Sequence, residues 1–217
     1  FFRIQFIFLC MHSIQTLVFD FGGVILDLKP EIEWFQQDML AHFENDKLLK
    51  LYQQQYFQNF EKGKIEVSDF LRQLQEITIH KNITETEIKR HWNAILKSIP
   101  AHRVEIIRQL KSKYQLILLS NTNAIHVEQF RNDMMEHFGE DVLDTHFDIV
   151  YYSQEIGMRK PHQEIYEFVQ NQHQLLPSTI LFLDDKAENL IEPQKLGWHT
   201  MHVHFNKLSI NDLQHLI

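Results

Sequence analysis

Three acidic side chains follow two apolar runs of the sequence. Residues 17–19 lead directly into Asp20, and residues 179–183 lead into Asp184 and Asp185. A short apolar run that ends in turn-forming residues is typical of a buried strand in a parallel sheet. Ligands of such sheets bind at the carboxyl ends of the strands, so these carboxylates could attack an electrophile or bind a hard cation. A simple cap of a turn is the structural alternative for Asp20.

Other polar residues belong to the same predicted edge. Ser120 and Asn121 follow the apolar run 116–119, and Lys160 lies in the loop Gly157–Pro161. Together with the carboxylates they suit phosphoryl transfer, in which a carboxylate attacks phosphorus while a hydroxyl and backbone N–H groups hold its oxygens. A lysine then neutralises the developing charge, and a divalent ion screens the nucleophile from the substrate. Taken singly, each residue also has a structural explanation, such as a helix cap or a solvated loop.

The elements that must position these residues alternate between strand and helix. The pattern predicts strands over 116–119, 147–151, 179–183 and 198–203, and helices over 103–113, 125–138, 164–172 and 187–196. This alternation predicts an α/β fold with a doubly wound, Rossmann-like parallel sheet.

Residues 29–100 have a different pattern. Apolar residues at helical spacing predict helices over 31–43, 47–60, 68–77 and 84–96, and no segment has the pattern of a strand. Thr84 and Glu87 have the spacing of a capping box. We therefore expect an all-helical cap at 29–100, inserted into a discontinuous core formed by 11–28 and 101–217. We interpret residues 1–10 as an N-terminal extension.

Composition excludes several classes of protein. The formal net charge of -8 argues against non-specific binding to nucleic acid, and no apolar stretch is long enough to span a membrane. Cys10 is the single cysteine, which rules out an intramolecular disulfide and favours a reducing cytoplasm. The sequence gives no indication of the oligomeric state.

Three histidines cluster around the last predicted strand. His202 and His204 share one face, as a pair of zinc ligands would, and His199 is nearby. No cysteine and no third ligand with fitting spacing accompany them. We therefore do not expect a structural zinc site.

The polar positions match, in order, the four motifs of the haloacid dehalogenase-like (HAD) hydrolases, which this sequence resembles. The matching residues are Asp20, Ser120, Lys160, and Asp184 and Asp185 with Asn189. The amino-acid sequences of the segments Gly157–Pro161 and Leu183–Asn189 also resemble those of the family motifs, beyond the single residues. The resemblance covers residues 14–205 and implies the HAD core fold.

The resemblance implies a metal site and a covalent step. Asp20 would be the nucleophile, forming an aspartyl-phosphate. Asp20, the carbonyl oxygen of Gly22 and Asp185 would be the protein ligands of Mg²⁺, which prefers hard oxygen ligands.

It also implies roles for the other motif residues. Ser120 and the backbone of Asn121 would hold the phosphate, and Lys160 would pair with both phosphate and nucleophile. Asp184 would support the metal without binding it directly, and Asn189 would orient the acidic cluster.

Gly22 departs from the family pattern. That position usually holds a second Asp, which protonates the leaving group and later activates water, and glycine can do neither. Some members with Gly here are grouped with sugar-phosphate phosphatases. We therefore expect a Mg²⁺-dependent phosphatase of a small phosphorylated metabolite, such as a sugar phosphate or nucleotide.

Two alternatives stay open. A low-turnover binding or regulatory protein would tolerate Gly22. A dehalogenase needs neither the acid nor magnesium, but the pair Asp184 and Asp185 would then be a liability. Specificity would reside in the cap, where Trp34, Phe35, Tyr56 and Phe60 are candidates to face the site, although each is more typical of a cap core.

Overall fold

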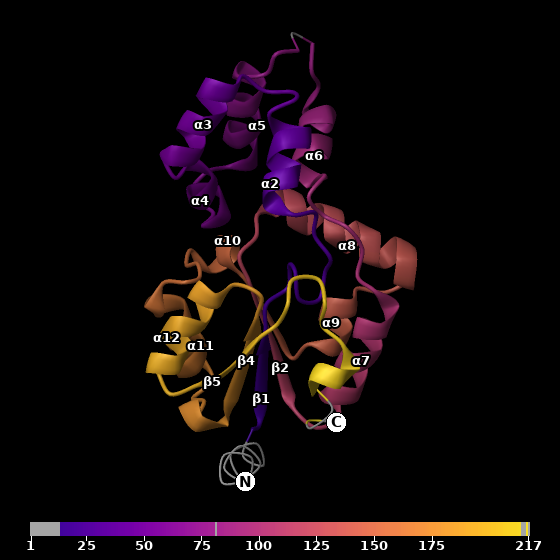
Figure 1. The fold of residues 1–217 in the computed structure, drawn as a ribbon, viewed down its shortest axis with the longest axis vertical. Coiled ribbons are helices and arrows are strands. Elements are labelled where there is room, and N and C mark those ends of the chain that lie inside the picture. Colours follow the sequence, from indigo (N-terminus) through magenta and orange to yellow (C-terminus); the bar gives the residue numbers. More distant parts are fainter. Residues whose placement is uncertain (1–13, 81, 214–215, 217) are drawn as a thin grey trace.

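A computed structural model of the protein describes residues 14–80, 82–213 and 216. The predicted N-terminal extension, 1–10, lies outside these residues. The described chain forms a lower layer built on a sheet and an upper layer of helices (Figure 1). Within it, a five-stranded parallel sheet has the order β3-β2-β1-β4-β5. The strands are β1 (Thr16–Phe19), β2 (Gln115–Ser120), β3 (Ile149–Tyr152), β4 (Ile180–Asp184) and β5 (His199–His202). The predicted fold class is confirmed.

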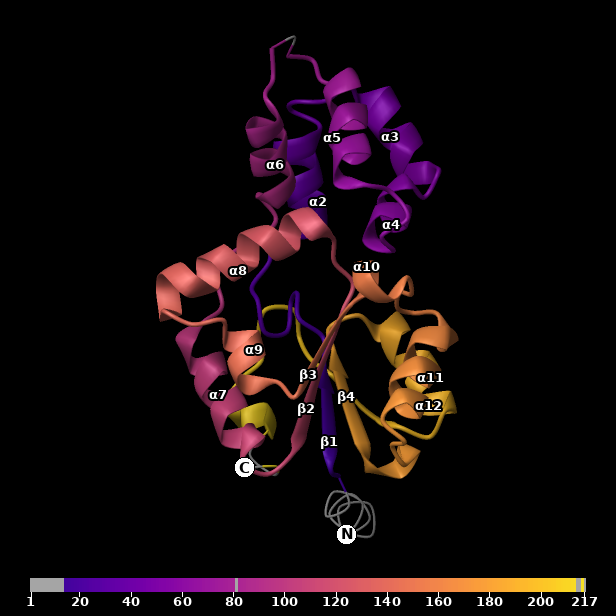
Figure 2. The same ribbon diagram turned by 180° about the vertical axis from the view of Figure 1, so that it is seen from behind.

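The central strand β1 is apolar on both faces because helices cover both. Leu17 and Phe19 pack into one hydrophobic cluster with the helices α7 (Ala101–Lys111), α8 (Ala124–Phe138) and α9 (Val142–His146). Val18 packs into another cluster with α11 (Gln163–Gln172). Successive side chains of a strand point to opposite faces, so a strand covered on both sides must be apolar throughout. Figures 1 and 2 show the two groups of helices on either side of the sheet.

The helices of the lower layer follow the predicted order. They are α7 (Ala101–Lys111), α8 (Ala124–Phe138), α9 (Val142–His146), α10 (Ser153–Ile156), α11 (Gln163–Gln172) and α12 (Ile191–Lys195), with the 3₁₀ turns η2 (Pro177–Thr179), η3 (Ala187–Leu190) and η4 (Ile210–Leu213). The sequence pattern did not predict α9 and α10, because helices of five and four residues are too short to show a helical period.

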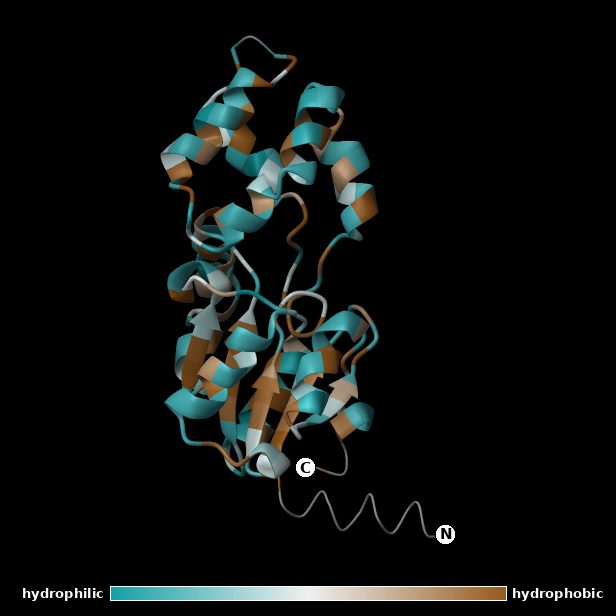
Figure 3. Cartoon of the chain, turned by 90° about the vertical axis from the view of Figure 1, so that its left-hand side faces the viewer, coloured by the Kyte–Doolittle hydropathy of each residue, from teal (hydrophilic) through white to brown (hydrophobic). Residues whose placement is uncertain are grey.

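The upper layer is helical and has a hydrophobic cluster of its own. Its helices are α2 (Glu31–Trp34), the π-helical turn η1 (Phe35–Met39), α3 (Asn45–Gln53), α4 (Tyr56–Glu61), α5 (Val67–Glu76) and α6 (Glu85–Asn93). Thr84 and Glu87 form the predicted capping box at the start of α6. The cluster includes the buried aromatic side chains of Trp34, Phe43, Phe57, Phe60, Phe70 and Trp92, and Figure 3 shows hydrophilic and hydrophobic residues mixed along these helices.

Two predicted cap helices differ from the structure. The segment 47–60 is divided into α3 and α4 by Gln55, whose φ of 58° lies in the left-handed region. The helix predicted over 31–43 ends earlier, at Met39, and its last turn is the π-helical η1. When the helices on both sides of a break face the same core, the helical spacing of apolar residues continues across the break. The spacing alone therefore could not show where these helices end.

Two extended segments connect the layers and pair with each other. Leu28 and Leu96 form an antiparallel bridge, and backbone hydrogen bonds join Lys29 to Ile95 (2.8 Å) and Lys97 to Asp27 (2.9 Å). The boundaries that we predict for core and cap lie at or a few residues beyond this crossing, and they stay a prediction. No helix in the described part of the chain is long and apolar enough to cross a membrane.

Candidate active site

Three carboxylates meet at the carboxyl edge of the sheet. Oxygen atoms of Asp20, Asp184 and Asp185 all lie within 4.8 Å of one another. β1 and β4 are neighbours in parallel register, with Phe19 opposite Leu183, so the residues that follow these two are brought side by side. The Asp20 amide donates a hydrogen bond to the Leu183 carbonyl (2.8 Å), which fixes the backbone of Asp20 at this edge.

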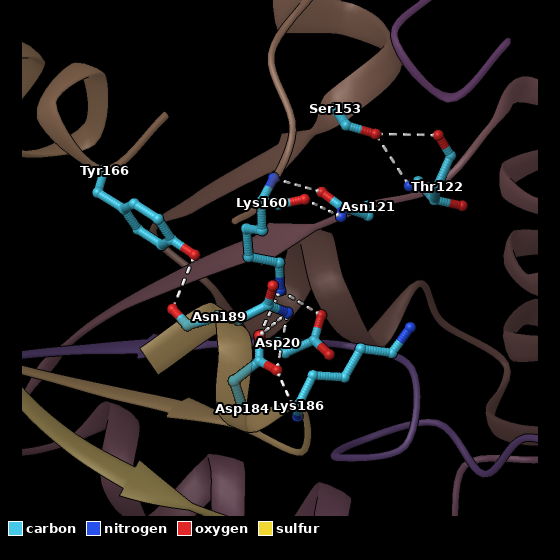
Figure 4. Close-up of polar contacts among 9 residues, drawn as sticks. All are labelled: Asp20, Asn121, Thr122, Ser153, Lys160, Tyr166, Asp184, Lys186 and Asn189. Carbon is cyan, nitrogen blue, oxygen red and sulfur yellow. Dashed lines mark hydrogen bonds and ion pairs between the residues drawn. The ribbon is translucent and has the colours of Figure 1, made fainter. Parts of the chain in front are cut away.

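Lys160 lies at the centre of this acidic group. Its buried ammonium is 2.7 Å from Asp20 Oδ1 and 2.7 Å from Asp184 Oδ2 (Figure 4). Asn121 fixes the backbone of Lys160 from both sides, because its Oδ1 accepts from the Lys160 N–H and its Nδ2 donates to the Lys160 carbonyl, each at 2.9 Å. Asn121, which directly follows β2, therefore positions the lysine-bearing loop with its side chain.

Asp184 and Asp185 differ in their partners. Asp184 accepts hydrogen bonds from Lys160, from Asn189 Nδ2 at 3.0 Å to each oxygen, and from the Lys186 backbone N–H (2.8 Å). Asp185 Oδ1, in contrast, is buried and has no hydrogen-bond donor within the described part of the chain. A buried acceptor without a donor is rare in proteins and calls for another partner.

The groups around Asp20 carry more negative than positive charge. Burial raises the pKa of Asp20 to about 7, and the charges of Asp184 and Asp185 add to that effect against the opposing charge of Lys160. Burial, followed by the charge of Asp184, also raises the pKa of Asp185. Burial alone would lower the pKa of Lys160, but the charges of Asp184 and Asp20 raise it, so the lysine stays charged.

A divalent cation fits these groups. It would give the unpartnered Asp185 oxygen a partner and would balance the excess negative charge. The Gly22 carbonyl, the third predicted ligand, accepts no backbone hydrogen bond in the described segments. Oxygen donors of this kind are the ligands that Mg²⁺ prefers.

The two glycines after Asp20 have different structural roles. Gly23 has a φ of 81°, and a Cβ atom there would lie 2.7 Å from Asp185 Oδ2 and 2.8 Å from Phe205 Cδ2. Gly22 lies outside the left-handed region, and a Cβ there would meet only the end of the Leu28 side chain, at 2.8 Å. The backbone therefore requires glycine at 23, whereas at 22 it does not exclude a side chain.

The remaining predicted phosphate ligand, Ser120, ends β2 and is buried. β2 is the other neighbour of β1, with Leu118 opposite Phe19, so Ser120 lies at the same edge as Asp20. Asn189 is buried beneath the carboxylates, where its backbone carbonyl accepts from the Tyr166 hydroxyl at 2.8 Å. All the predicted site residues thus come from one edge of the sheet, although their roles stay predictions.

Contacts between the two layers were not predicted. Arg159 Nη2 lies 3.1 Å from Glu61 Oε2 at the end of α4, and Ser153 Oγ donates to the Glu61 carbonyl (2.6 Å). Gly63 packs so closely on the Gln154 carbonyl that a Cβ would overlap it. In the sequence, the feature that could have indicated these contacts is that Arg159 directly precedes Lys160 of the motif.

Two other sequence hypotheses can be compared with the structure. Trp34 and Phe60 are buried in the hydrophobic cluster of the upper layer, and Phe35 and Tyr56 pack against it, which favours the interpretation as cap core. The ring of His202 pairs with the Asp185 carbonyl (2.8 Å). Among the described residues, the three carboxylates are the one group with metal-ligand geometry.

The model of the haloacid dehalogenase-like hydrolases matches residues 14–196. This chain belongs to that family. The HAD resemblance and the assignment to the hydrolases are therefore confirmed, and the match includes each of the four motifs.

Two curated relatives of this HAD hydrolase are phosphatases. A D-ribitol-5-phosphate phosphatase of Bacteroides thetaiotaomicron is 31% identical over 189 residues, covering 86% of this chain and 90% of the relative. A sesquiterpene phosphatase of Aspergillus oryzae is 25% identical over 94% of this chain and 97% of its own length.

Solved structures agree with the family. A HAD family enzyme from B. thetaiotaomicron has a TM-score of 0.80 and 28% identity, covering 92% of this chain and 98% of its own. Its complex with magnesium and inorganic phosphate has a TM-score of 0.78 at 27% identity, covering 90% and 96%. A dehalogenase at 19% identity and a TM-score of 0.56, covering 88% and 85%, shares the fold.

Proposed function

We propose that this protein is a Mg²⁺-dependent phosphatase that removes phosphate from a small phosphorylated metabolite by way of an aspartyl-phosphate on Asp20. One observation carries the proposal. Lys160 pairs with Asp20 and Asp184, while the buried Oδ1 of the neighbouring Asp185 has no donor in the described chain. This combination is suited to a carboxylate nucleophile beside a cation.

In the first half of the reaction Asp20 attacks phosphorus. The new Asp20–phosphorus bond forms as the bond from phosphorus to the ester oxygen breaks, and the leaving oxygen takes the electron pair. Lys160 holds the attacking carboxylate and offsets charge on the phosphoryl oxygens, while Ser120 and the Asn121 backbone N–H donate to those oxygens. Mg²⁺ held by Asp20, Asp185 and the Gly22 carbonyl would screen the repulsion between nucleophile and phosphate.

In the second half water attacks the phosphorus of the aspartyl-phosphate. The Asp20–phosphorus bond breaks, its electron pair returns to the carboxylate, and inorganic phosphate leaves. Asp184 and Asn189 take no part in bond changes. Their hydrogen bonds hold Lys160 and the acidic cluster in place.

The substrate that we propose is a phosphate ester of a small polar alcohol, such as a sugar or sugar alcohol. The residues where the upper layer meets the site are charged: Glu31, Glu61, Arg159 and Lys186. Such groups favour hydroxyl-bearing substrates over an apolar chain, because a substrate that covers them must supply polar partners. The D-ribitol-5-phosphate phosphatase relative supports this choice over the sesquiterpene phosphatase. A cytoplasmic location stays a prediction.

Hydrolysis of p-nitrophenyl phosphate with Mg²⁺ tests the activity, and Asp20→Asn tests the nucleophile. The variant keeps the size of the side chain but loses the attacking charge, so turnover should vanish while the circular dichroism spectrum is retained. Wild-type protein should also bind beryllium fluoride as an aspartyl-phosphate mimic. Wild-type protein that binds phosphate without turnover would instead support the regulatory alternative.

A further inference from the structure

Lys186 is a charged residue of the site that the reaction above does not use. It follows Asp184 and Asp185 directly, and its backbone N–H donates to Asp184 Oδ1 (2.8 Å), which fixes the start of the side chain. Figure 4 shows the side chain extending past the Asp20 carboxylate, so that the ammonium lies beyond the nucleophile, away from Lys160.

Carboxylates of both layers attract this ammonium. Asp20 and Asp185 belong to the sheet edge, whereas Glu31 begins α2 and Glu61 ends α4. Lys186 is an exposed residue, and these four carboxylates attract its positive charge. A lysine side chain is an ammonium at neutral pH, and the carboxylates around this one favour the charged form.

Lys186 differs from the two neighbouring cations in its contacts. Lys160 forms two ion pairs and Arg159 forms one, whereas Lys186 forms none within the described residues. A cation that is attracted by several carboxylates but touches none of them is free to contact a ligand. Its place, between Asp20 and the acids of the upper layer, is the side of the site from which a substrate must reach the nucleophile.

The reaction needs a positive group on that side. Asp20 attacks phosphorus roughly in line with the leaving oxygen, so that oxygen faces away from the nucleophile and toward the upper layer. Gly22 supplies no acid to protonate it. The negative charge that develops there must be stabilised in another way.

We propose that Lys186 contacts the leaving oxygen of the phosphate ester and stabilises the negative charge that it acquires. This inference rests on the proposed phosphatase function. The electron pair of the broken phosphorus–oxygen bond goes to the leaving oxygen, which then takes a proton from water. Lys186 keeps its own protons throughout and contributes only its charge.

The test compares two phosphate esters that carry the same phosphoryl group and differ in the leaving group. The phenolate of p-nitrophenyl phosphate is a stable leaving group, whereas the alkoxide of ethyl phosphate is not. Lys186→Met should lower kcat/KM for ethyl phosphate by about 10²-fold, similar to removal of an oxyanion-stabilising donor, and that for p-nitrophenyl phosphate by less than about tenfold. Lys186→Arg, which keeps the charge, should recover much of the difference.

Lys195→Met is the matched control, because Lys195 pairs with Glu192 on α12 and its side chain is mostly exposed. An equal loss on both esters in Lys186→Met would assign the lysine to phosphate binding and would overturn the inference. No loss on either ester would do the same. Wild-type protein that hydrolyses neither ester in Mg²⁺ would contradict the proposed function itself, and with it this inference.

A second variant keeps the test decisive. Gly22→Asp introduces an acid two residues after Asp20, and the backbone there does not exclude a side chain. If both groups act on the leaving oxygen, Gly22→Asp should raise the ethyl-to-aryl rate ratio more in Lys186→Met than in the wild type. An equal effect in both backgrounds would place the two residues at different atoms and would overturn the inference.

Discussion

The Arg159 guanidinium lies 3.1 Å from the Glu61 carboxylate and so joins helix α4 of the upper layer to the loop that carries Lys160. Arg159 contacts the upper layer, and its neighbour Lys160 contacts Asp20 and Asp184. Ser153 adds a second link through the Glu61 carbonyl. These contacts therefore link the upper layer to the loop that holds Lys160 beside Asp20.

Glu61→Gln tests this connection. The pair is partly exposed, so its loss should weaken the link by about 1 kcal/mol, seen as a several-fold rise in KM with a smaller change in kcat. Burial raises the pKa of Glu61 although Arg159 opposes the rise, so the charged form is disfavoured in the folded chain. The glutamine should therefore leave the Tm nearly unchanged.

Glu76→Gln is the control, since Glu76 ends α5 on the exposed side of the upper layer. If Glu61→Gln lowers Tm and kcat together, the pair has a structural role only.

Metal removal should abolish phosphatase activity, and added Mg²⁺ should restore it. Asp185→Asn should raise the Mg²⁺ concentration needed for half-maximal activity by at least tenfold, because it replaces one charged oxygen ligand with a neutral amide. Asp46→Asn, an exposed acid of α3, should leave that concentration unchanged. Full activity in excess chelator would contradict the magnesium proposal.

Alanine at the two glycines should have opposite outcomes. Gly23→Ala forces a side chain into a left-handed backbone and against Asp185 and Phe205, so it should lower stability by about 1–3 kcal/mol and abolish activity. In Gly22→Ala the new methyl group meets the end of the Leu28 side chain, which can rotate away, so the variant should fold with near-normal stability. Urea unfolding of both variants measures the difference. Comparable losses would show that the turn needs both glycines.

Stability should fall with acidity through His126. Burial lowers the pKa of this ring to about 3, and the ring stacks on Trp92 and pairs with Asn93 (2.8 Å) where α6 meets α8. The unfolded chain gains a proton below about pH 6.5 that the folded chain does not. The stability contributed is thus present above about pH 6.5 and is lost as the pH falls toward 3.

Urea unfolding at pH 5, 6 and 7 checks this prediction. The free energy of unfolding should fall more steeply in the wild type than in His126→Phe, by up to about 1.4 kcal/mol per pH unit. His137→Phe, at an exposed position of the same helix, should keep the wild-type slope. Identical slopes in all three proteins would exclude His126 as the titrating group.

The amino-acid sequence by itself determined the architecture of the lower layer and the residues gathered there. Apolar runs such as 17–19 must be buried on both faces, which requires a parallel sheet covered by helices. The carboxyl ends of parallel strands share one edge. Asp20, Ser120 and Asp184 therefore had to lie at that edge, and the strand order that makes them neighbours came from the structure.

Only the tertiary structure showed which of these residues contact one another. Lys160 and Asp20 are 140 positions apart, and no local pattern shows that the lysine pairs with Asp184 while an oxygen of Asp185 is left for a cation. Nor could the sequence show that Gly23 is required and Gly22 is not, or that Glu61 reaches Arg159. These relationships depend on side-chain directions and on contacts between distant segments, whereas a periodic pattern records only which face of an element is buried.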